Sequence, residues 1–164
     1  MGMPTWCNLI GLYKGEKSIL SFANFPILNK YYIAYDKKCL IKEGTNQRKI
    51  SSNKKVNFNN IRLAVNTLGT IKKRNVSNFL KKFQGIFKIT GSDAYNFCLI
   101  AEGKLDILIE CGLKKVDFYP LISIIKNSGA IITDWNGKMK FPRGDVLVAA
   151  NRKLHHHVLK KIRT

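Results

Sequence analysis

The chain has 164 residues, of which 45% are hydrophobic, which is enough for one domain with a core. No apolar run reaches the length that a membrane span needs, and the first residues lack the basic and then apolar segments of a signal peptide. We therefore expect no membrane partner and a cytoplasmic location.

The net charge of +19 raises nucleic-acid binding as a function class. The lysines, however, are spread along the whole chain, and no stretch interleaves aromatic with basic residues. We therefore expect a solvated basic surface without a nucleic-acid partner, whose field can attract a phosphate dianion. A basic nucleic-acid-binding protein remains an alternative that rests on charge alone.

The cysteines and histidines do not form a metal-binding pattern. Cys7, Cys39, Cys98 and Cys111 are scattered without a Cys-x-x-Cys pair, which is typical of reduced core residues. The run His155–His157 falls on a predicted helix, where consecutive side chains point about 100° apart and cannot converge on one ion. We expect these three histidines at the surface.

The first half of the chain, residues 1–89, is expected to be mainly sheet. Alternating patterns predict strands over 5–13, 18–25, 31–35, 38–42, 62–67 and 86–89, with turns at 14–16 and 36–37. Residues 44–53 are expected to be a polar loop, and 76–83 a helix with Ser77 as its N-cap. Thr67 or Thr70, near a strand end, could touch a substrate, although their spacing does not argue it.

The second half, residues 90–164, alternates helices and strands. A helix begins at Gly91-Ser92-Asp93, with Ser92 as N-cap, and ends at Gly103. A strand over 106–110 follows, then a helix that Asp117 caps and Gly129 ends. The rest is expected to be a strand over 130–133, a hairpin turn at Asn136-Gly137, a strand over 146–149 and a helix from Asn151. This order predicts an α/β layer.

Two helix starts in this half have the chemistry of a phosphate or metal site. Free backbone N–H groups at Gly91, Ser92 and Asp93 suit a phosphate. Glu110 leaves a strand end and Asp117 begins the next helix, and such carboxylates can gather at one edge of a sheet and bind Mg²⁺. Structural alternatives stay open: Asp117 as an N-cap only, Glu110 as a solvated strand end and Asp93 as a favourable charge on the helix dipole.

A longer pattern joins these residues. Gly91-Ser92-x-Ala94, Ala101-x-Gly103-x-x-Asp106, Glu110, Asp117 and Gly129-x-x-x-Thr133-Asp134-Trp135-x-Gly137 follow one another in this order. The pattern resembles the C-terminal signature of the inositol monophosphatase family. Within that family, Leu113-Lys114 and Thr133-Asp134-Trp135 are most similar to the bacterial histidinol-phosphatase branch.

The beginning of the chain extends the resemblance. Gly2-x-Pro4-x-Trp6, followed by residues 9–12, resembles the family segment that directly follows the Asp-Pro-x-Asp-Gly-Thr metal motif. That motif and the earlier Gly-Glu-Glu stretch are absent from this sequence. The resemblance implies the later part of the family's α-β-α-β-α layered sandwich, in a single truncated domain over residues 1–164.

The resemblance also implies an activity: Mg²⁺-dependent hydrolysis of a small phosphate monoester, with histidinol phosphate, a histidine-biosynthesis intermediate, as substrate. It implies Asp117 as the surviving metal ligand, Gly91, Ser92 and Asp93 as substrate contacts, and Glu110 as an acceptor for the alcohol portion. It further implies a homodimer for the intact protein. An inositol-phosphate phosphatase and a non-catalytic remnant are the alternatives, and we expect the isolated chain to be inactive.

Overall fold

The computed structural model describes residues 2–65, 71–89 and 91–163, and it contains two five-stranded sheets. Sheet A is an antiparallel meander. Its strands follow the chain order β1 (Asn8–Lys14), β2 (Lys17–Phe25), β3 (Lys30–Tyr35), β4 (Lys38–Glu43) and β5 (Asn46–Lys49), with a short 3₁₀ helix η1 (Pro26–Leu28) before β3. The tight turn between β3 and β4 places Asp36 and Lys37 at positive φ, as the right-handed twist of a two-residue hairpin requires.

Sheet B is mixed. Its spatial order is β7 (Ile86–Ile89), β6 (Arg62–Val65), β8 (Ile107–Glu110), β10 (Val146–Ala149) and β9 (Ile131–Thr133). Strand β6 runs parallel to β7 and β8, whereas β10 runs antiparallel to β8 and β9. All four residues of the central strand β8 are buried, because helices cover both of its faces.

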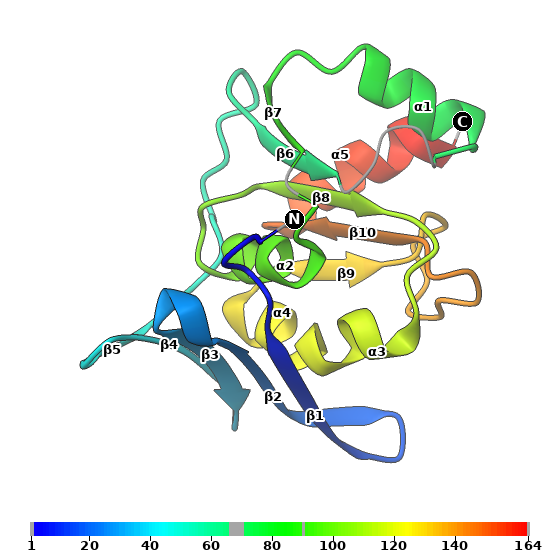
Figure 1. The fold of residues 1–164 in the computed structure, drawn as a ribbon. Helices are drawn as coiled ribbons and strands as arrows, with labels where there is room; N and C mark the ends of the chain where they lie inside the picture. The colour runs from blue at the N-terminus through cyan, green and yellow to red at the C-terminus, as the bar shows by residue number, and fades with distance from the viewer. Residues whose placement is uncertain (1, 66–70, 90, 164) are drawn as a thin grey trace.

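The helices lie in two layers (Figure 1). Helices α2 (Asp93–Ala101), α3 (Lys115–Phe118) and α4 (Ile122–Ser128) lie between the sheets, with the 3₁₀ helix η3 (Tyr119–Leu121), whereas α1 (Arg74–Lys81) and α5 (Arg152–Arg163) cover the far face of sheet B. This β-α-β-α order confirms the predicted α/β layered fold. Among the described residues no helix has both the length and the apolar character to cross a membrane.

Alternate residues of β8 pack in two different hydrophobic cores. Leu108 joins the core between the sheets, together with Phe97 of α2 and Ile124 of α4. Ile107 and Ile109 join the core beneath α1 and α5. Because successive strand residues point to opposite faces, this one strand connects both cores.

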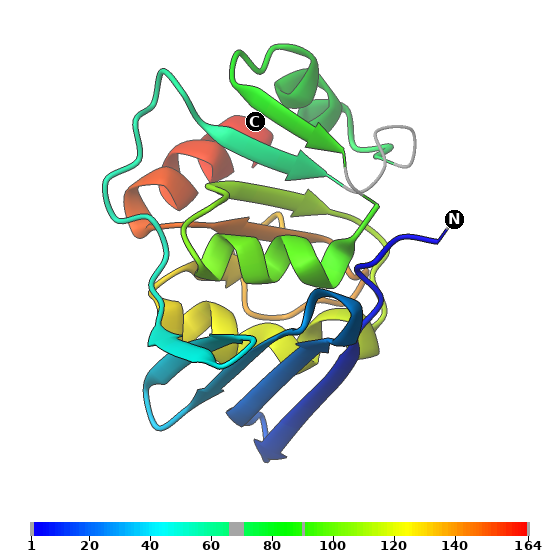
Figure 2. The same ribbon diagram turned by 60° about the vertical axis from the view of Figure 1, so that its left-hand side comes forward.

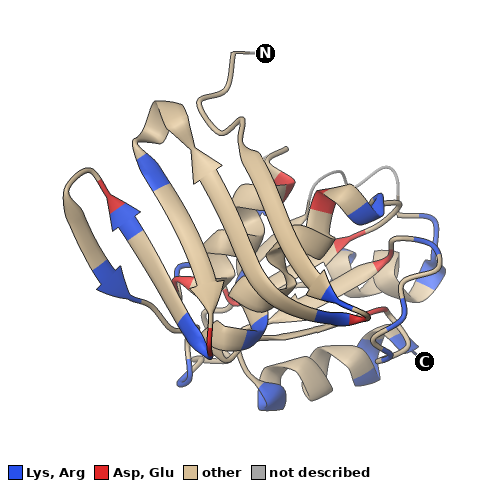
Figure 3. Ribbon diagram, turned by 90° about the horizontal axis from the view of Figure 1, so that it is seen from below, with Lys and Arg blue, Asp and Glu red and all other residues tan. Residues whose placement is uncertain are grey.

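No described helix covers the outer face of sheet A (Figure 2), and strand β1 is apolar on this face. Ile10 and Leu12 are 57% and 54% exposed there. Seen from below, the middles of β1, β2 and β3 carry no charged position, and the nearby lysines lie at the strand ends (Figure 3). In this view the basic residues are spread over several elements, as the sequence predicts.

Two predictions for the first half need correction. The loop expected over 44–53 contains the edge strand β5, whose four residues are all exposed and which pairs with β4. The helix expected over 76–83 begins earlier, with Lys73 as N-cap, so Ser77 lies inside α1 and donates its N–H to the carbonyl of Lys73. Both segments contain many polar side chains, so the spacing of apolar residues does not mark the strand or the start of the helix.

The helix after β8 also differs from the prediction. Pro120 lacks a backbone N–H, and the expected helix is divided into α3, η3 and α4. The N-cap of α3 is Lys114, so Asp117 occupies the third helical position and not the cap. Its carboxylate accepts the backbone N–H of Lys114 at 2.7 Å. The predicted stop at Gly129 is confirmed, with φ at +94°.

Two further predictions need correction. His155 is buried, not at the surface, and its Nε2 lies 2.8 Å from the hydroxyl of Thr133, which a helix facing β9 makes possible. Asn136 and Gly137 do form a turn, closed by a bond from Gly137 N–H to the Asp134 carbonyl at 3.0 Å. This turn does not join paired strands directly, because β10 begins only at Val146.

Candidate active site

The predicted site residues lie around the corner at which β8 ends and α2 and α3 begin (Figure 2). Glu110 is the last residue of β8, pairs with Val146 of β10 and is 2% exposed. It is therefore a buried carboxylate, and the alternative of a solvated strand end is wrong. The chain then turns at Gly112, which has a φ of +69°.

The loop after Glu110 is fixed against a second loop. Leu113 donates its N–H to the carbonyl of Gly144 at 3.1 Å. A Cβ at Gly144 would overlap the backbone of Leu113, so only glycine permits this approach. The loop that leads from Glu110 to Asp117 is thus held by backbone contact.

The start of α2 is shaped by Gly91, whose φ of +57° favours glycine. Ser92 occupies the N-cap as predicted, but its hydroxyl makes no capping bond. The hydroxyl lies instead 2.7 Å from the hydroxyl of Thr5, in a buried position. The first residues of the chain are thereby attached beside the start of α2 (Figure 2).

Asp93 is the first residue of α2, and its environment is unfavourable for a charge. Its Oδ1 atom is buried and has no hydrogen-bond partner among the described residues. Burial raises the pKa of this carboxyl, and the nearby charge of Asp117 raises it further. The two carboxylates, which are 24 positions apart in the sequence, are thus brought close enough to repel each other.

Asp117 is half-buried in the first turn of α3. Within the described residues, its Oδ2 atom takes the bond from Lys114, and no bond engages Oδ1. One oxygen of the residue is thus engaged in local structure, and the other has no bond among the described residues. Thr67 and Thr70 lie outside the described residues.

The fit of a magnesium ion can be tested on these groups. The described residues contain no group of three His, Cys, Asp or Glu side chains that could hold a metal. Mg²⁺, however, is often bound by one or two carboxylates and completes its shell with water and phosphate. The buried oxygen of Asp93, next to the charge of Asp117, fits a partial site of this kind, because a cation would relieve the repulsion.

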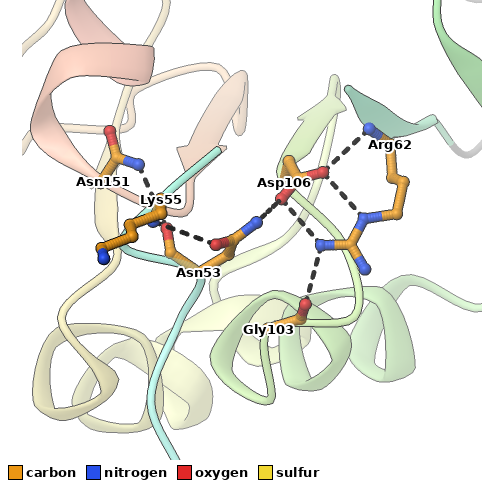
Figure 4. A network of polar contacts seen from close by, with 6 residues as sticks. All are labelled: Asn53, Lys55, Arg62, Gly103, Asp106 and Asn151. Carbon is orange, nitrogen blue, oxygen red and sulfur yellow. Dashed lines mark hydrogen bonds and ion pairs between the residues drawn. The ribbon is translucent and has the colours of Figure 1, made fainter. Parts of the chain in front are cut away.

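A different carboxylate stands at the opposite end of β8 (Figure 4). Asp106 accepts hydrogen bonds from Arg62 Nε at 2.8 Å, Arg62 Nη2 at 2.9 Å and Asn53 Nδ2 at 2.9 Å. Burial alone would raise the pKa of Asp106, but the bonds from Arg62 and Asn53 outweigh burial and hold the pKa below its ordinary value. Asp106 therefore connects β6, β8 and the loop that holds Asn53.

Comparison with known proteins agrees with this geometry. The model of the inositol monophosphatase family matches residues 1–164. The chain belongs to the inositol monophosphatase family. An inositol monophosphatase from Zymomonas mobilis superposes with a TM-score of 0.85 at 23% identity, over 99% of this chain and 64% of the other. That likeness shows the shared fold.

Several curated relatives share this family likeness. The fructose-1,6-bisphosphatase/inositol-1-monophosphatase of Aquifex aeolicus is 26% identical over 166 residues, which cover 96% of this chain and 60% of the relative. The histidinol-phosphatase of Mycobacterium tuberculosis is 23% identical over 165 residues, covering 98% and 63%. The chloroplastic bifunctional phosphatase IMPL2 of Arabidopsis thaliana is 48% identical over 48 residues, which are 29% of this chain and 14% of the relative. The chain thus spans less than two thirds of the length of these relatives.

The comparisons do not favour histidinol-phosphatase over the other activities that these names contain. The residues that predicted this branch have structural contacts here. Lys114 caps α3, Asp134 accepts the backbone N–H groups of Asn136 and Lys138, and Trp135 Nε1 donates to the carbonyl of Val146 at 3.1 Å. The family is established, and the branch stays a prediction.

Sequence reasoning missed Thr5 and Arg62. Thr5 lies 87 positions from its partner Ser92, and Arg62 lies 44 positions from Asp106. No local pattern joins residues so far apart. The one available signal was that Thr5 and Asp106 both fall within segments that resemble the family.

Proposed function

We propose that this chain forms the substrate-facing part of a Mg²⁺-dependent phosphatase that acts on a small phosphate monoester. The observation that supports the proposal most is the approach of Asp93 and Asp117, with a buried oxygen of Asp93 that has no hydrogen-bond partner among the described residues. Two like charges disfavour each other's ionised form unless a cation compensates them. Each carboxylate has a local role at its helix start, but neither role compensates the charge of the other.

Each predicted residue has a role in this proposal. Asp117 holds the metal ion through its second oxygen, and Gly91, Ser92 and Asp93 contact the substrate at the start of α2, where backbone N–H groups favour an anion. When bound, Mg²⁺ would polarise the phosphate and lower the pKa of a water molecule. Glu110 accepts a hydrogen bond from the alcohol portion, or from the ammonium or imidazole of histidinol phosphate.

The bond between Thr5 and Ser92 holds the first residues of the chain beside the candidate site, which is where further metal ligands would be needed. Thr5 lies in the segment that resembles the one after the family's metal motif. We infer that residues preceding this segment in a longer relative reach the site beside α2. The isolated chain then supplies only part of the metal shell, and a non-catalytic role is the alternative that the absence of a three-ligand group among the described residues favours.

The substrate that we propose first is histidinol phosphate, because of the resemblance at Leu113-Lys114 and Thr133-Asp134-Trp135. An inositol phosphate is the alternative, since relatives of both kinds match nearly the whole chain. A homodimer and a cytoplasmic location remain predictions of the family resemblance and the composition.

The test is a fusion of the chain to the preceding part of the Aquifex aeolicus relative. Release of phosphate from histidinol phosphate and from inositol monophosphate is then measured with Mg²⁺ and with a chelator. We expect Mg²⁺-dependent turnover by the fusion, a larger kcat/KM for histidinol phosphate, and near-background turnover by the chain alone.

The variant Glu110→Gln in the fusion should change KM and the ratio between the two substrates more than kcat, because the proposed partner of Glu110 is the alcohol portion. Glu16→Gln, in the exposed turn between β1 and β2, is the matched control. A well-folded fusion that releases no phosphate from either substrate would contradict the proposed activity and favour the non-catalytic alternative.

A further inference from the structure

A hollow of about 720 Å³ lies between α1, α5 and the loop that precedes β6. It reaches Ile107, the first residue of β8, which faces the core beneath α1 and α5. The candidate active site lies at the other end of β8, where α2 begins on the opposite face of sheet B (Figure 1). The hollow is therefore a separate feature, and its volume is within the range of about 300–1,000 Å³ typical of ligand pockets.

The lining combines three kinds of side chain. Its wall contains the aromatic rings of Phe58, Phe79 and Phe83, the amides of Asn59, Asn75, Asn78 and Gln84, and the basic groups of Lys82, His157 and Lys161. Among the described residues that line the hollow there is no carboxylate. The chemistry of the wall thus suits a ligand with a flat ring, polar ring edges and a negative charge.

Phe58 differs from the other two rings. Phe79 and Phe83 pack against the core beneath α1 and α5, with ring centroids 6.0 Å apart. Phe58 is 38% exposed and is not packed in that core. Its edge-on contact with His157 has a centroid distance of 5.2 Å, and the ammonium of Lys153 lies 5.5 Å from its ring centre. Folding does not require this ring at the rim, but a stacking ligand would use it.

The electrostatic potential in the hollow is positive, like the charge of its basic side chains. Burial lowers the pKa of His157, and the charge of Lys161 lowers it further. A positive potential therefore acts on the histidine ring within the hollow. An anion bound there would reverse this effect.

We propose that the hollow binds a small anion that carries a heteroaromatic ring, of the class of nucleoside monophosphates. The ring would stack on Phe58, as nucleic-acid bases do on aromatic side chains. The amides of Asn59, Asn75 and Asn78 can donate to and accept from polar ring edges. Lys82 would bind the phosphate as a point charge. No part of this inference depends on the proposed phosphatase activity.

The test measures binding to the full 164-residue chain by calorimetry, in the presence of a chelator, with adenosine 5′-phosphate, adenosine and inorganic phosphate as separate probes. We expect adenosine 5′-phosphate to bind at least tenfold more tightly than either fragment. Its binding should raise the pKa of His157 in an NMR titration.

Variants locate the binding. Phe58→Ala and Lys82→Gln should each weaken binding of adenosine 5′-phosphate at least fivefold, and both positions are exposed, so the fold should be kept. Lys49→Gln on β5 removes the same charge far from the hollow and should change nothing. Asp117→Asn should also leave the affinity unchanged, which separates this hollow from the candidate active site.

Four results would overturn the proposal. These are no binding at millimolar nucleotide, equal affinity for one of the fragments, an equal loss in Lys49→Gln, and a change in Asp117→Asn with none in Phe58→Ala. The last two would assign the binding to general charge or to the candidate active site.

Discussion

The carboxylates of Asp106 and Asp93, near the two ends of strand β8, have opposite environments. At one end, Asp106 receives bonds from Arg62 and Asn53, and its pKa lies below its ordinary value. At the other end, Asp93 has a buried oxygen without a partner among the described residues, lies near Asp117, and has a raised pKa.

We propose that this difference separates a carboxylate that stabilises the fold from one that binds a ligand. Buried polar groups are normally satisfied within the protein, so an exception needs an explanation. Strongly perturbed groups cluster at functional sites because ligand binding, not folding, compensates them. The comparison therefore makes separate predictions for stability and for activity at the two ends.

The largest effect on stability is expected from Arg62→Met, which leaves Asp106 buried without its cation. Because Arg62 is 32% exposed and the bond from Asn53 remains, breaking this pair should cost roughly 2–3 kcal/mol of unfolding free energy, measurable by urea denaturation. The matched control is Arg48→Met at the pair with Glu102, whose carboxylate is as buried but keeps the ammonium of Lys104 at 2.7 Å and the hydroxyl of Tyr32 at 2.9 Å, so the loss should be smaller. Equal losses in the two variants would contradict the distinction between the ends.

The pH dependence of stability should follow Asp106. Its folded pKa is below the unfolded value of about 3.9, so its contribution is present above that value and is lost as pH falls through the folded pKa. Urea midpoints between neutral and strongly acidic pH should fall more steeply for the wild type than for Arg62→Met. Parallel curves for the two proteins would show that this pair does not control acid stability.

A smaller effect is expected from Asp93→Asn. The change removes the repulsion from Asp117 but also a favourable charge at the start of α2, so stability should change by less than about 1 kcal/mol in either direction. Asp106→Asn, which weakens the bonds from Arg62, is the comparison and should destabilise clearly. If Asp93→Asn destabilised the chain as much, Asp93 would be a structural carboxylate like Asp106.

The smallest effect is expected from Mg²⁺ on the isolated chain. Two carboxylates without further protein ligands should bind the ion weakly, and the gain in stability is about 0.4 kcal/mol when the ion concentration equals Kd. Backbone NMR shifts on addition of Mg²⁺ should fall on Asp93, Asp117 and their neighbours. Shifts around Asp106 instead would reverse the assignment of the two ends.

Much of the fold was predictable because local patterns record burial. The apolar run before Glu110, the alternation along β2 and β3, and the stop at Gly129 all reflect a face that packs or a backbone angle. What the sequence did not show depends on distant partners or lies in a polar, exposed segment. The examples are the ion pair of Arg62 with Asp106, the bond of His155 to Thr133, and the edge strand β5.

The candidate site was predictable to a similar extent. Resemblance to the family selected Gly91, Ser92, Asp93, Glu110 and Asp117, and the charge of Asp117 lies near enough to Asp93 to raise the pKa of that carboxyl. The sequence did not show that Lys114 caps α3 in place of Asp117. A carboxylate is common both at the N-cap and at the third helical position, so the sequence pattern does not separate the two. The position of Thr5 beside Ser92 required three-dimensional structure.

The most direct test of the central claim is Asp117→Asn in the fusion that contains the preceding segment, assayed for Mg²⁺-dependent phosphate release. The amide removes the charge from the metal site, so the rate should fall about 100-fold or more, since even groups outside a metal's coordination shell are typically worth about 10–100-fold. Asp36→Asn, the same change in the exposed turn between β3 and β4, should keep full activity. If Asp117→Asn left both the rate and its dependence on Mg²⁺ unchanged, Asp117 would be a structural residue of α3, and the assignment of the metal site would be wrong.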